Sequence, residues 1–309
     1  MTILTPMAVV TVTEQEIASQ PDTWTQALGL RARTHDLLLA PGERVLALGC
    51  GTSAFMAQSF AVLRERAGLG ETDWAYGSEP LVNRGYDRVV AITRSGTTTE
   101  VLDSLARVLP GTRRVGVTAV TGEPVDAMTD DQLLLDFADE RSVVQTRFPT
   151  TLLVAVRAAL GTDLTGAIES LRDVVDAPLP VDVSDFDHFV FLGTGWTIGL
   201  AHEAALKIRE AAQAWSESYP GMDYRHGPIA VAGRRSLVTM FGEPPAGLVD
   251  SVRATGATVL TDDLDPLVQL VRAQRLAIAL AASRGLDPDN PRALTRSVIL
   301  SSAQNGDLS

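Results

Sequence analysis

The sequence predicts an α/β protein built from two related halves, each with a parallel sheet sandwiched by helices. Short apolar runs alternate with helical segments, a pattern typical of buried parallel strands with crossover helices. One run enters the turn Gly49-Cys50-Gly51, and a second enters Gly193-Thr194-Gly195, so the same pattern starts twice. The alternative is one large doubly wound domain.

The order of elements follows from the apolar periodicity. Residues 13–40 read as helical, with an apolar face that includes Trp24, Ala27 and Leu28. The first half then has predicted strands at 44–49, 88–93, 114–118 and 132–137, and helices at 54–67, 99–108 and 146–160. The second half begins near residue 186 and has predicted strands at 189–193, 236–241 and 257–260, with helices between them. We place the halves at 1–175, including the lead helices at about 1–40, and at 176–309, including a C-terminal tail. The linker lies near 173–184, where Ala177-Pro178-Leu179-Pro180 interrupts the periodicity.

Composition narrows the class of partner. The formal charge of −12 disfavours nonspecific binding to nucleic acid or to an anionic membrane. The single cysteine, Cys50, excludes an intramolecular disulfide and a cysteine-rich zinc site. No apolar run reaches the roughly 20 residues of a membrane span, and no secretory signal is evident. We therefore expect a cytoplasmic protein without a metal or a bound cofactor.

A cluster of hydroxyl side chains follows the predicted strand at 88–93. It is the stretch Thr93-Arg94-Ser95-Gly96-Thr97-Thr98-Thr99, and a helix opens at Glu100. Hydroxyls and free backbone N–H groups at a strand-to-helix turn donate hydrogen bonds, and the helix dipole favours negative charge. The stretch predicts an anion cradle for a metabolite phosphate, and Ser53 is expected to meet it. The alternative is an ordinary Ser/Thr-rich helix cap.

The first glycine turn also fits a weak form of the dinucleotide fingerprint, Gly49-Cys50-Gly51-Thr52-Ser53-Ala54. A nicotinamide site is disfavoured because the next strand ends in the hydroxyl cluster and has no clear terminal acidic residue. The second glycine turn is followed by Trp196 and Thr197 instead.

Two further segments carry groups suited to proton transfer. Helical spacing places Glu203, Lys207 and Glu210 on one face, where the lysine is expected to hold both carboxylates ionised and to position a carboxylate base. Surface ion pairing is the alternative. His226 lies in a Gly-Pro turn, where a fixed imidazole can act as an acid or a base. The alternative is a structural turn histidine.

Taken together, these segments resemble the double sugar isomerase (SIS) domain family. The resemblance rests on residues 49–53, 92–98, 140–147, 191–195, 203–210, 225–228 and 290–298, in that order. Within this family, the sequence resembles the isomerase half of glucosamine-6-phosphate synthase, the stand-alone amino-sugar-phosphate isomerase/deaminases and the fructosamine-phosphate deglycases. The resemblance implies flavodoxin-like halves and a homodimer that binds a sugar phosphate between the halves.

The resemblance also implies a role for each matched residue. Ser53, Thr93, Ser95 and Thr98 match the phosphate-binding hydroxyls, and Val143 and Gln145 match a sugar-contacting loop. Glu210 matches the carboxylate that moves a proton between C1 and C2, with Lys207 beside it and Glu203 in the same site. His226 matches the histidine that opens the sugar ring, often across the dimer.

The sequence departs from the family pattern at three places. The match starts near residue 40, so we expect no glutaminase half. Arg296 stands where the synthase has a Schiff-base lysine, and arginine cannot form that imine. Arg94 and Thr97 replace a common glutamine and a common acidic residue, and Arg94 is expected to add a charge-assisted phosphate contact.

The resulting expectation is an amino-sugar-phosphate isomerase/deaminase. The alternatives are a fructosamine-phosphate deglycase and a non-catalytic sugar-phosphate-binding regulator.

Overall fold

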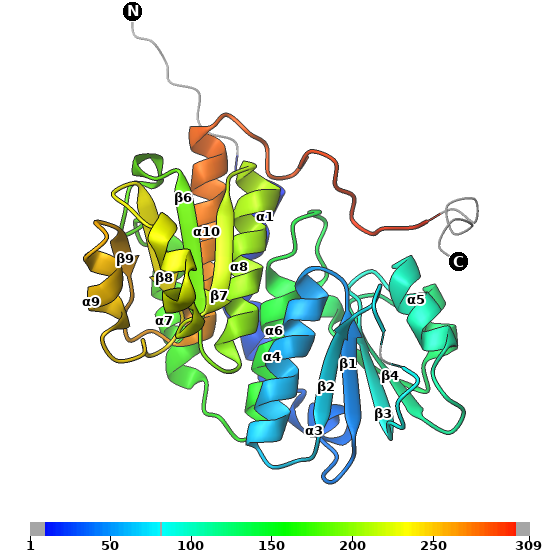
Figure 1. The fold of residues 1–309 in the computed structure, drawn as a ribbon. Helices are drawn as coiled ribbons and strands as arrows, with labels where there is room; N and C mark the ends of the chain where they lie inside the picture. The colour runs from blue at the N-terminus through cyan, green and yellow to red at the C-terminus, as the bar shows by residue number, and fades with distance from the viewer. Residues whose placement is uncertain (1–9, 81, 301–309) are drawn as a thin grey trace, which may run out of the picture.

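Two separate parallel sheets form the framework of the computed structural model, which describes residues 10–80 and 82–300 (Figure 1). The first sheet has the order β2-β1-β3-β4-β5, the flavodoxin-like order, and the second has the order β7-β6-β8-β9. The strands of the first sheet are β1 Val45–Gly49, β2 Thr72–Tyr76, β3 Arg88–Ile92, β4 Arg113–Thr118 and β5 Asp131–Leu134. Those of the second are β6 His188–Gly193, β7 Ser216–Pro220, β8 Ser236–Met240 and β9 Thr258–Leu260. The predicted fold class is confirmed, and the single doubly wound sheet is excluded.

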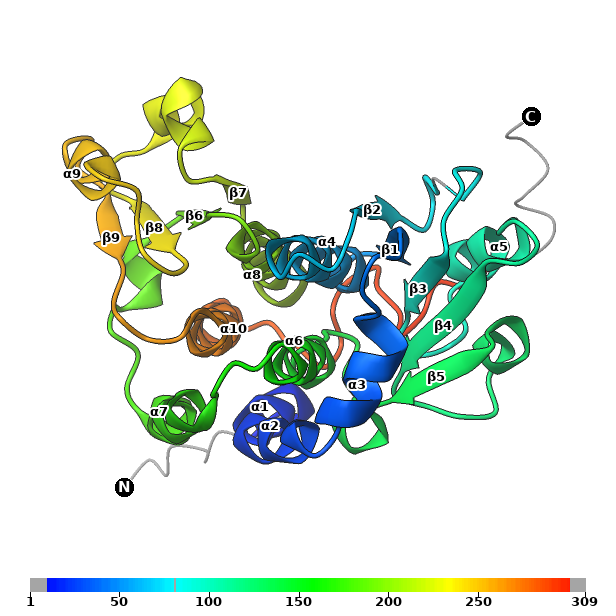
Figure 2. The ribbon, with the colours of Figure 1, turned by 90° about the horizontal axis from the view of Figure 1, so that it is seen from below.

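Helices lie between the sheets and outside them (Figure 2). The helices are α1 Val12–Ala18, α2 Gln20–Leu28, α3 Arg31–Leu38, α4 Thr52–Arg66, α5 Thr99–Ala106, α6 Arg147–Ala159, α7 Thr165–Asp176, α8 Thr197–Ala212, α9 Leu248–Arg253 and α10 Pro266–Ser283. One large apolar core joins α4, α6, α8 and α10 to the facing sides of both sheets. Smaller clusters bury α5 on the outer face of the first sheet and α9 on that of the second. Each sheet is therefore covered on both faces.

The central strands are apolar because both of their faces are buried. Every residue of β1, β3 and β8 is buried, which is why a continuous apolar run predicts them. Two of the four edge strands differ: β2 reads Thr-Asp-Trp-Ala-Tyr and β7 reads Ser-Glu-Ser-Tyr-Pro, and both are mostly part-exposed. The sequence prediction missed both, because neither contains a continuous apolar run.

The lead segment is helical over most of the predicted stretch 13–40 and consists of three helices, α1 to α3. Pro21 lies in the first turn of α2, and Gly29 caps its end. The last predicted strand of the first half ends at Leu134 and is followed by a short turn. The proposed linker begins inside α7, which continues to Asp176, and the division of the chain into two domains stays a prediction.

Candidate functional site

The hydroxyl cluster lies where the sequence predicts it, between β3 and α5. Gly96 takes a left-handed φ of 69°, which lets the turn close without a side-chain clash. Ser53 is at the first turn of α4, directly after β1, the strand next to β3. The carboxyl ends of neighbouring parallel strands share one sheet edge, so Ser53 and Thr93 lie on the same side of the first sheet. Both residues are buried.

The C-terminal tail, defined here as residues 295–300, lies across this cradle. The hydroxyl of Ser297 is 3.1 Å from that of Ser95, 2.9 Å from that of Thr97 and 3.3 Å from that of Thr98. The Thr99 N–H donates to the Val298 carbonyl, and the Leu300 N–H donates to the Thr99 hydroxyl. Ser297 is a cradle residue that the sequence analysis missed, although it directly follows Arg296.

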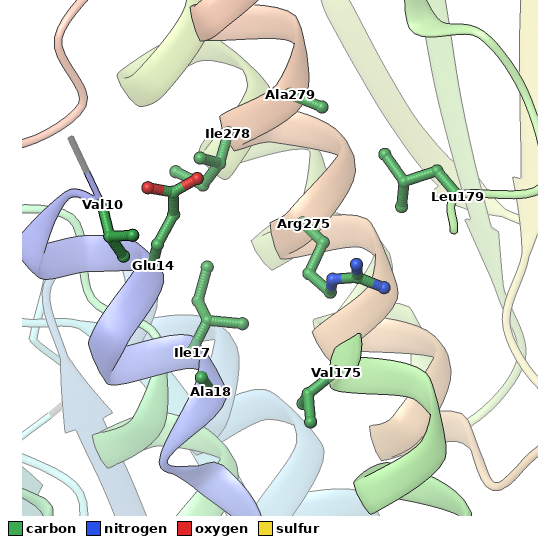
Figure 3. Close-up of a pocket in the computed structure, with 9 residues that line it drawn as sticks. All are labelled: Val10, Glu14, Ile17, Ala18, Val175, Leu179, Arg275, Ile278 and Ala279. Atoms are coloured by element: carbon green, nitrogen blue, oxygen red, sulfur yellow. The ribbon is translucent and has the colours of Figure 1, made fainter. Parts of the chain in front are cut away.

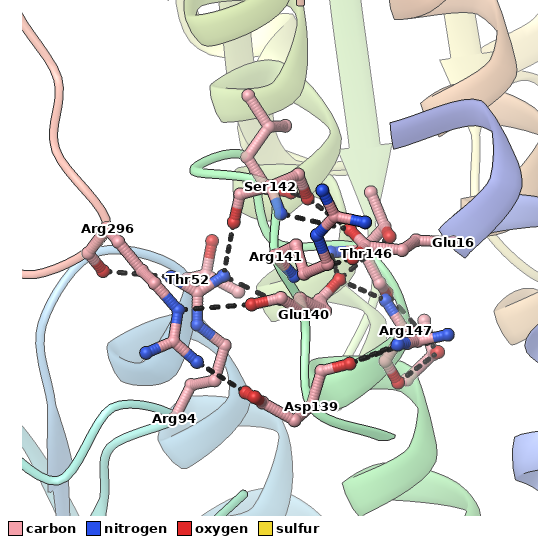
Figure 4. Close-up of polar contacts among 12 residues, drawn as sticks. Glu16, Thr52, Arg94, Asp139, Glu140, Arg141, Ser142, Thr146, Arg147 and Arg296 are labelled. Atoms are coloured by element: carbon pink, nitrogen blue, oxygen red, sulfur yellow. Dashed lines mark hydrogen bonds and ion pairs between the residues drawn. The ribbon is translucent and has the colours of Figure 1, made fainter. Parts of the chain in front are cut away.

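The guanidinium of Arg94 is turned toward Arg296 and the segment 139–146 (Figure 4). Its Nη1 donates to the Ser142 carbonyl at 2.9 Å and its Nη2 to the Arg296 carbonyl at 2.8 Å. The guanidinium also lies 3.7 Å from the buried carboxylate of Glu140. The contacts of Arg94 are therefore to the tail and to the segment 139–146.

That segment carries Val143 and Gln145, the expected sugar contacts, and both are part-exposed. Two buried carboxylates hold its backbone. Glu16 of α1 accepts from the Arg141 N–H at 2.6 Å and from the Ser142 hydroxyl, and Glu140 accepts from the Thr146 hydroxyl at 2.8 Å. Arg296 contributes from the surface, with its Nη2 2.5 Å from Asp139. No sequence pattern points to Glu16, which lies more than 120 residues away in the chain.

Glu203, Lys207 and Glu210 form an ion-pair group on α8, as the helical spacing predicts. Lys207 Nζ is 3.3 Å from Glu203 and 2.5 Å from Glu210. Glu203 and Lys207 are buried, whereas the Glu210 side chain is 19% exposed. Surface ion pairing is therefore wrong for this group, and Glu210 is the member that a bound molecule can reach.

The charge states of the group follow from its burial. Burial raises the pKa of Glu203 to about 7, despite the opposing effect of Lys207. At Glu203 desolvation outweighs the ion pair, so burial opposes the expected effect of the lysine on this carboxylate. Burial also favours the neutral amine of Lys207, but Glu203 and Glu210 outweigh it and raise its pKa.

The group on α8 lies next to the first turn of α4. Lys207 Nζ donates to the Thr52 hydroxyl at 3.2 Å, and Thr52 directly precedes Ser53. Further along the same pair of helices, the Ser59 hydroxyl donates to the Trp196 carbonyl, so α4 and α8 run antiparallel. Gly199 makes this close approach possible, since a Cβ there would collide with Ser59 and Phe55. The carboxyl half of α8 is thereby held at the carboxyl edge of the first sheet, beside the cradle.

His226 lies apart from the α8 group and the cradle. It is exposed, in the short turn Asp223–His226 that follows β7. β7 ends beside the end of β6, where Gly193 pairs with Pro220, and α8 starts just after that point. Glu210 is near the other end of α8, roughly 20 Å along the helix axis. Within one chain the structure therefore does not bring His226 and Glu210 together.

A cavity of about 290 Å³ lies outside this site, between α1, α10 and the end of α7 (Figure 3). Its lining is mainly aliphatic, and its two charged members are Glu14 and Arg275. Glu14 caps α1, and Arg275 donates to the Ala177 carbonyl at 2.7 Å. None of the predicted site residues lines it. Within 10–80 and 82–300, no helix has the length and apolarity to cross a membrane, and no cluster of metal-ligating side chains occurs.

Comparison with known proteins finds similar aminotransferases. No protein-family model matches the chain. A glutamine–fructose-6-phosphate aminotransferase (isomerizing) from Thermus thermophilus is 28% identical over 92% of the chain. One from Pyrococcus horikoshii is 26% identical over 84% of the chain. The chain spans only 58% and 52% of the lengths of these two relatives.

Solved structures agree along nearly the whole chain. Glucosamine-6-phosphate deaminase from Thermotoga maritima has a TM-score of 0.82 and 25% identity, covering 94% of this chain and 100% of that one. Along nearly its whole length the chain is therefore similar to SIS-domain phosphosugar isomerases. Tagatose-6-phosphate ketose/aldose isomerase from Escherichia coli shares the fold, with a TM-score of 0.71 and 22% identity over 93% of this chain and 98% of that one. In this chain, the α8 group and the cradle are the candidate site.

Proposed function

We propose that this chain is a sugar-phosphate isomerase that deaminates an amino-sugar phosphate, converting a hexosamine 6-phosphate and water into a ketohexose 6-phosphate and ammonia. The observation that carries the proposal is Glu210, a part-exposed carboxylate held at 2.5 Å by a buried lysine beside the anion cradle. The Thermotoga deaminase, similar over nearly all of both chains, supports the same reaction class.

Glu210 is suited to move one proton between neighbouring carbons. In the open-chain substrate, its carboxylate takes the proton from C2, next to the C1 aldehyde, and returns it to C1. The aldehyde oxygen gains a proton and the amino group loses one, so the product is a C1 alcohol with an imine at C2, which water hydrolyses to a ketone and ammonia. The substrate supplies the imine nitrogen itself, so the reaction does not need a Schiff-base lysine at the position of Arg296. Lys207 fixes the position of the carboxylate.

The cradle has a separate task. Thr93, Ser95 and Thr98, together with Ser53, are proposed to bind the phosphate, with Val143 and Gln145 along the sugar. Holding the phosphate places C1 and C2 against Glu210 and uses binding energy remote from the reacting carbons. Ring opening is assigned to His226, and its distance from Glu210 within one chain supports a homodimer in which each subunit supplies His226 to the other's site.

The test is the release of ammonia and ketose phosphate from glucosamine 6-phosphate and galactosamine 6-phosphate. Glu210→Gln is expected to lower kcat by about 100-fold or more, because the amide cannot accept the C2 proton. Glu169→Gln, on the exposed face of α7, is the matched control and keeps wild-type kcat. Full activity of Glu210→Gln contradicts the assignment.

The same assay separates the competing functions. Cleavage of a fructosamine phosphate into sugar phosphate and amine, without deamination of either hexosamine phosphate, indicates a deglycase. Binding of these sugar phosphates without any turnover indicates a regulator. Either result overturns the proposed reaction.

A further inference from the structure

We propose that Arg94 is a positioning residue that fastens the C-terminal tail over the cradle, and that it is not a phosphate ligand. The inference concerns the site of the proposed function and rests on that function only where it names a phosphate. One buried guanidinium, that of Arg94, contacts two backbone segments that are about 150 residues apart (Figure 4).

The tail has little apolar burial to hold it in place. The side chains of Val298 and Ile299 are 49% and 69% exposed. What connects the tail to the rest of the molecule is polar: Ser297 on the cradle hydroxyls, and the backbone of Val298 and Leu300 on Thr99. Neutral hydrogen bonds of this kind contribute only about 1 kcal/mol each. A stronger and better shielded contact is needed to fix the course of the tail.

Arg94 supplies that contact. Its side chain is 1% exposed, and its two terminal nitrogens donate to the carbonyls of Ser142 and Arg296. A charged donor shielded from water forms a stronger hydrogen bond than a neutral one. The fork of the guanidinium joins the tail to the segment 139–146 in one geometry.

The far side of this connection is itself rigid. Ser142 donates from its hydroxyl to Glu16, and Glu140 balances the charge of Arg94 while it holds the start of α6. Arg94 therefore connects the tail to a fixed part of the fold. Arg296 adds an outer contact through Asp139, but there both side chains are more than a third exposed, so water weakens the pair.

The same geometry argues against a direct phosphate contact. Both terminal nitrogens are engaged by carbonyl oxygens, and in residues 10–80 and 82–300 neither bonds a cradle hydroxyl. Turning the terminal nitrogens toward an anion at Ser95 would require Arg94 to give up two hydrogen bonds and its buried carboxylate partner, and only its Nε–H has no partner among the described residues. The cost of leaving Glu140 unpaired in the interior opposes that movement.

The experiment compares wild-type protein with Arg94→Lys. Lysine keeps the positive charge beside Glu140, but its ammonium cannot form the planar fork between two carbonyls. Hydrogen exchange of the peptide covering 290–300 is expected to become about 10-fold faster. The Kd for inorganic phosphate is expected to rise by no more than about twofold relative to wild-type protein. Arg107→Lys, exposed at the end of α5, is the matched control and changes neither.

Two results overturn the inference. One is unchanged tail exchange in Arg94→Lys. The other is a rise of about 10-fold or more in the phosphate Kd with an unchanged tail, which makes Arg94 a phosphate ligand. Faster tail exchange in a protein that binds no phosphate, before or after substitution, supports the positioning role and overturns the phosphate cradle of the proposed function.

Asp139→Asn keeps the test decisive if Arg94→Lys does not fold. This variant weakens only the outer contact with Arg296, so tail exchange is expected to rise less than about threefold. A rise of about 10-fold in Asp139→Asn shows that the outer contact fastens the tail, and it overturns the role of Arg94.

Discussion

Lys207 organises the charges of the candidate site. Its ammonium is buried between two carboxylates in different surroundings: Glu203 is buried, and Glu210 is open to a bound molecule. Desolvation raises the pKa of Glu203 toward neutrality. The two carboxylates consequently differ: Glu203 is enclosed in the fold, and Glu210 is available for proton transfer.

The raised pKa of Glu203 predicts a pH dependence of stability. Its pKa is about 7 in the folded chain against an ordinary value of 4.5, so the folded state binds more protons between these pH values. The contribution of Glu203 to the free energy of unfolding is therefore present at pH 4.5 and lost as the pH rises to about 7. Glu203→Gln removes this loss, which is at most about 3 kcal/mol. Urea unfolding of both proteins at pH 5 and pH 7.5 measures it, and equal pH dependence in the two proteins contradicts the prediction.

Sequence predicted the identity of these residues better than their environment. The spacing of Glu203, Lys207 and Glu210 fixes a common helix face whatever surrounds it. Whether that face is buried depends on α4, because the Thr52 hydroxyl and the close approach at Gly199 bring the two helices together. Arg94 shows the same limit: its position next to the cradle is local, but the direction of its guanidinium depends on a partner 202 residues away.

At the scale of elements, the tail and the cradle share one set of hydroxyls. Ser297 occupies hydrogen-bonding positions that Ser95, Thr97 and Thr98 would offer to an anion. Strands followed by hydroxyl-rich turns are visible in a sequence, so the cradle was predictable. The tail has no periodicity, and its place on the cradle depends on contacts that only the folded chain creates.

This sharing predicts that Ser297→Ala binds inorganic phosphate about 5-fold more tightly than wild-type protein. In wild-type protein an anion must displace Ser297 from three cradle hydroxyls, at a cost of about one net hydrogen bond, roughly 1 kcal/mol. In the variant these hydroxyls are free, so this cost is absent. Isothermal titration with inorganic phosphate measures the change, and Ser283→Ala, exposed at the end of α10, is the control. Weaker binding by Ser297→Ala shows instead that Ser297 donates to the anion.

At the scale of the whole molecule, the strands of the two sheets run in opposite directions. The reason is that α4, which follows β1, packs antiparallel to α8, which follows β6. The carboxyl edge of the first sheet meets the carboxyl half of α8, whereas the carboxyl edge of the second lies at the start of α8, near His226. The repeated glycine turns predicted two similar halves. They carried no information on the relative direction of the halves, which the α4–α8 contact sets. Within one chain, Glu210 therefore lies near the end of α8, whereas His226, in the turn after β7, lies near the start of α8.

This separation predicts that activity requires two chains, with Glu210 from one and His226 from the other. Glu210→Gln and His226→Gln are each expected to be nearly inactive as pure proteins. After mixing, unfolding and refolding together, half of the dimers contain one chain of each kind, and each such dimer has one intact site. Activity is then expected to recover to about a quarter of the wild-type value, the fraction of intact sites in a two-fold dimer. A mixture of Glu210→Gln with Lys207→Met is the control and stays inactive, because both changes fall in the same half-site. Absence of recovery in the first mixture, with dimers present, means that His226 does not act across the subunits.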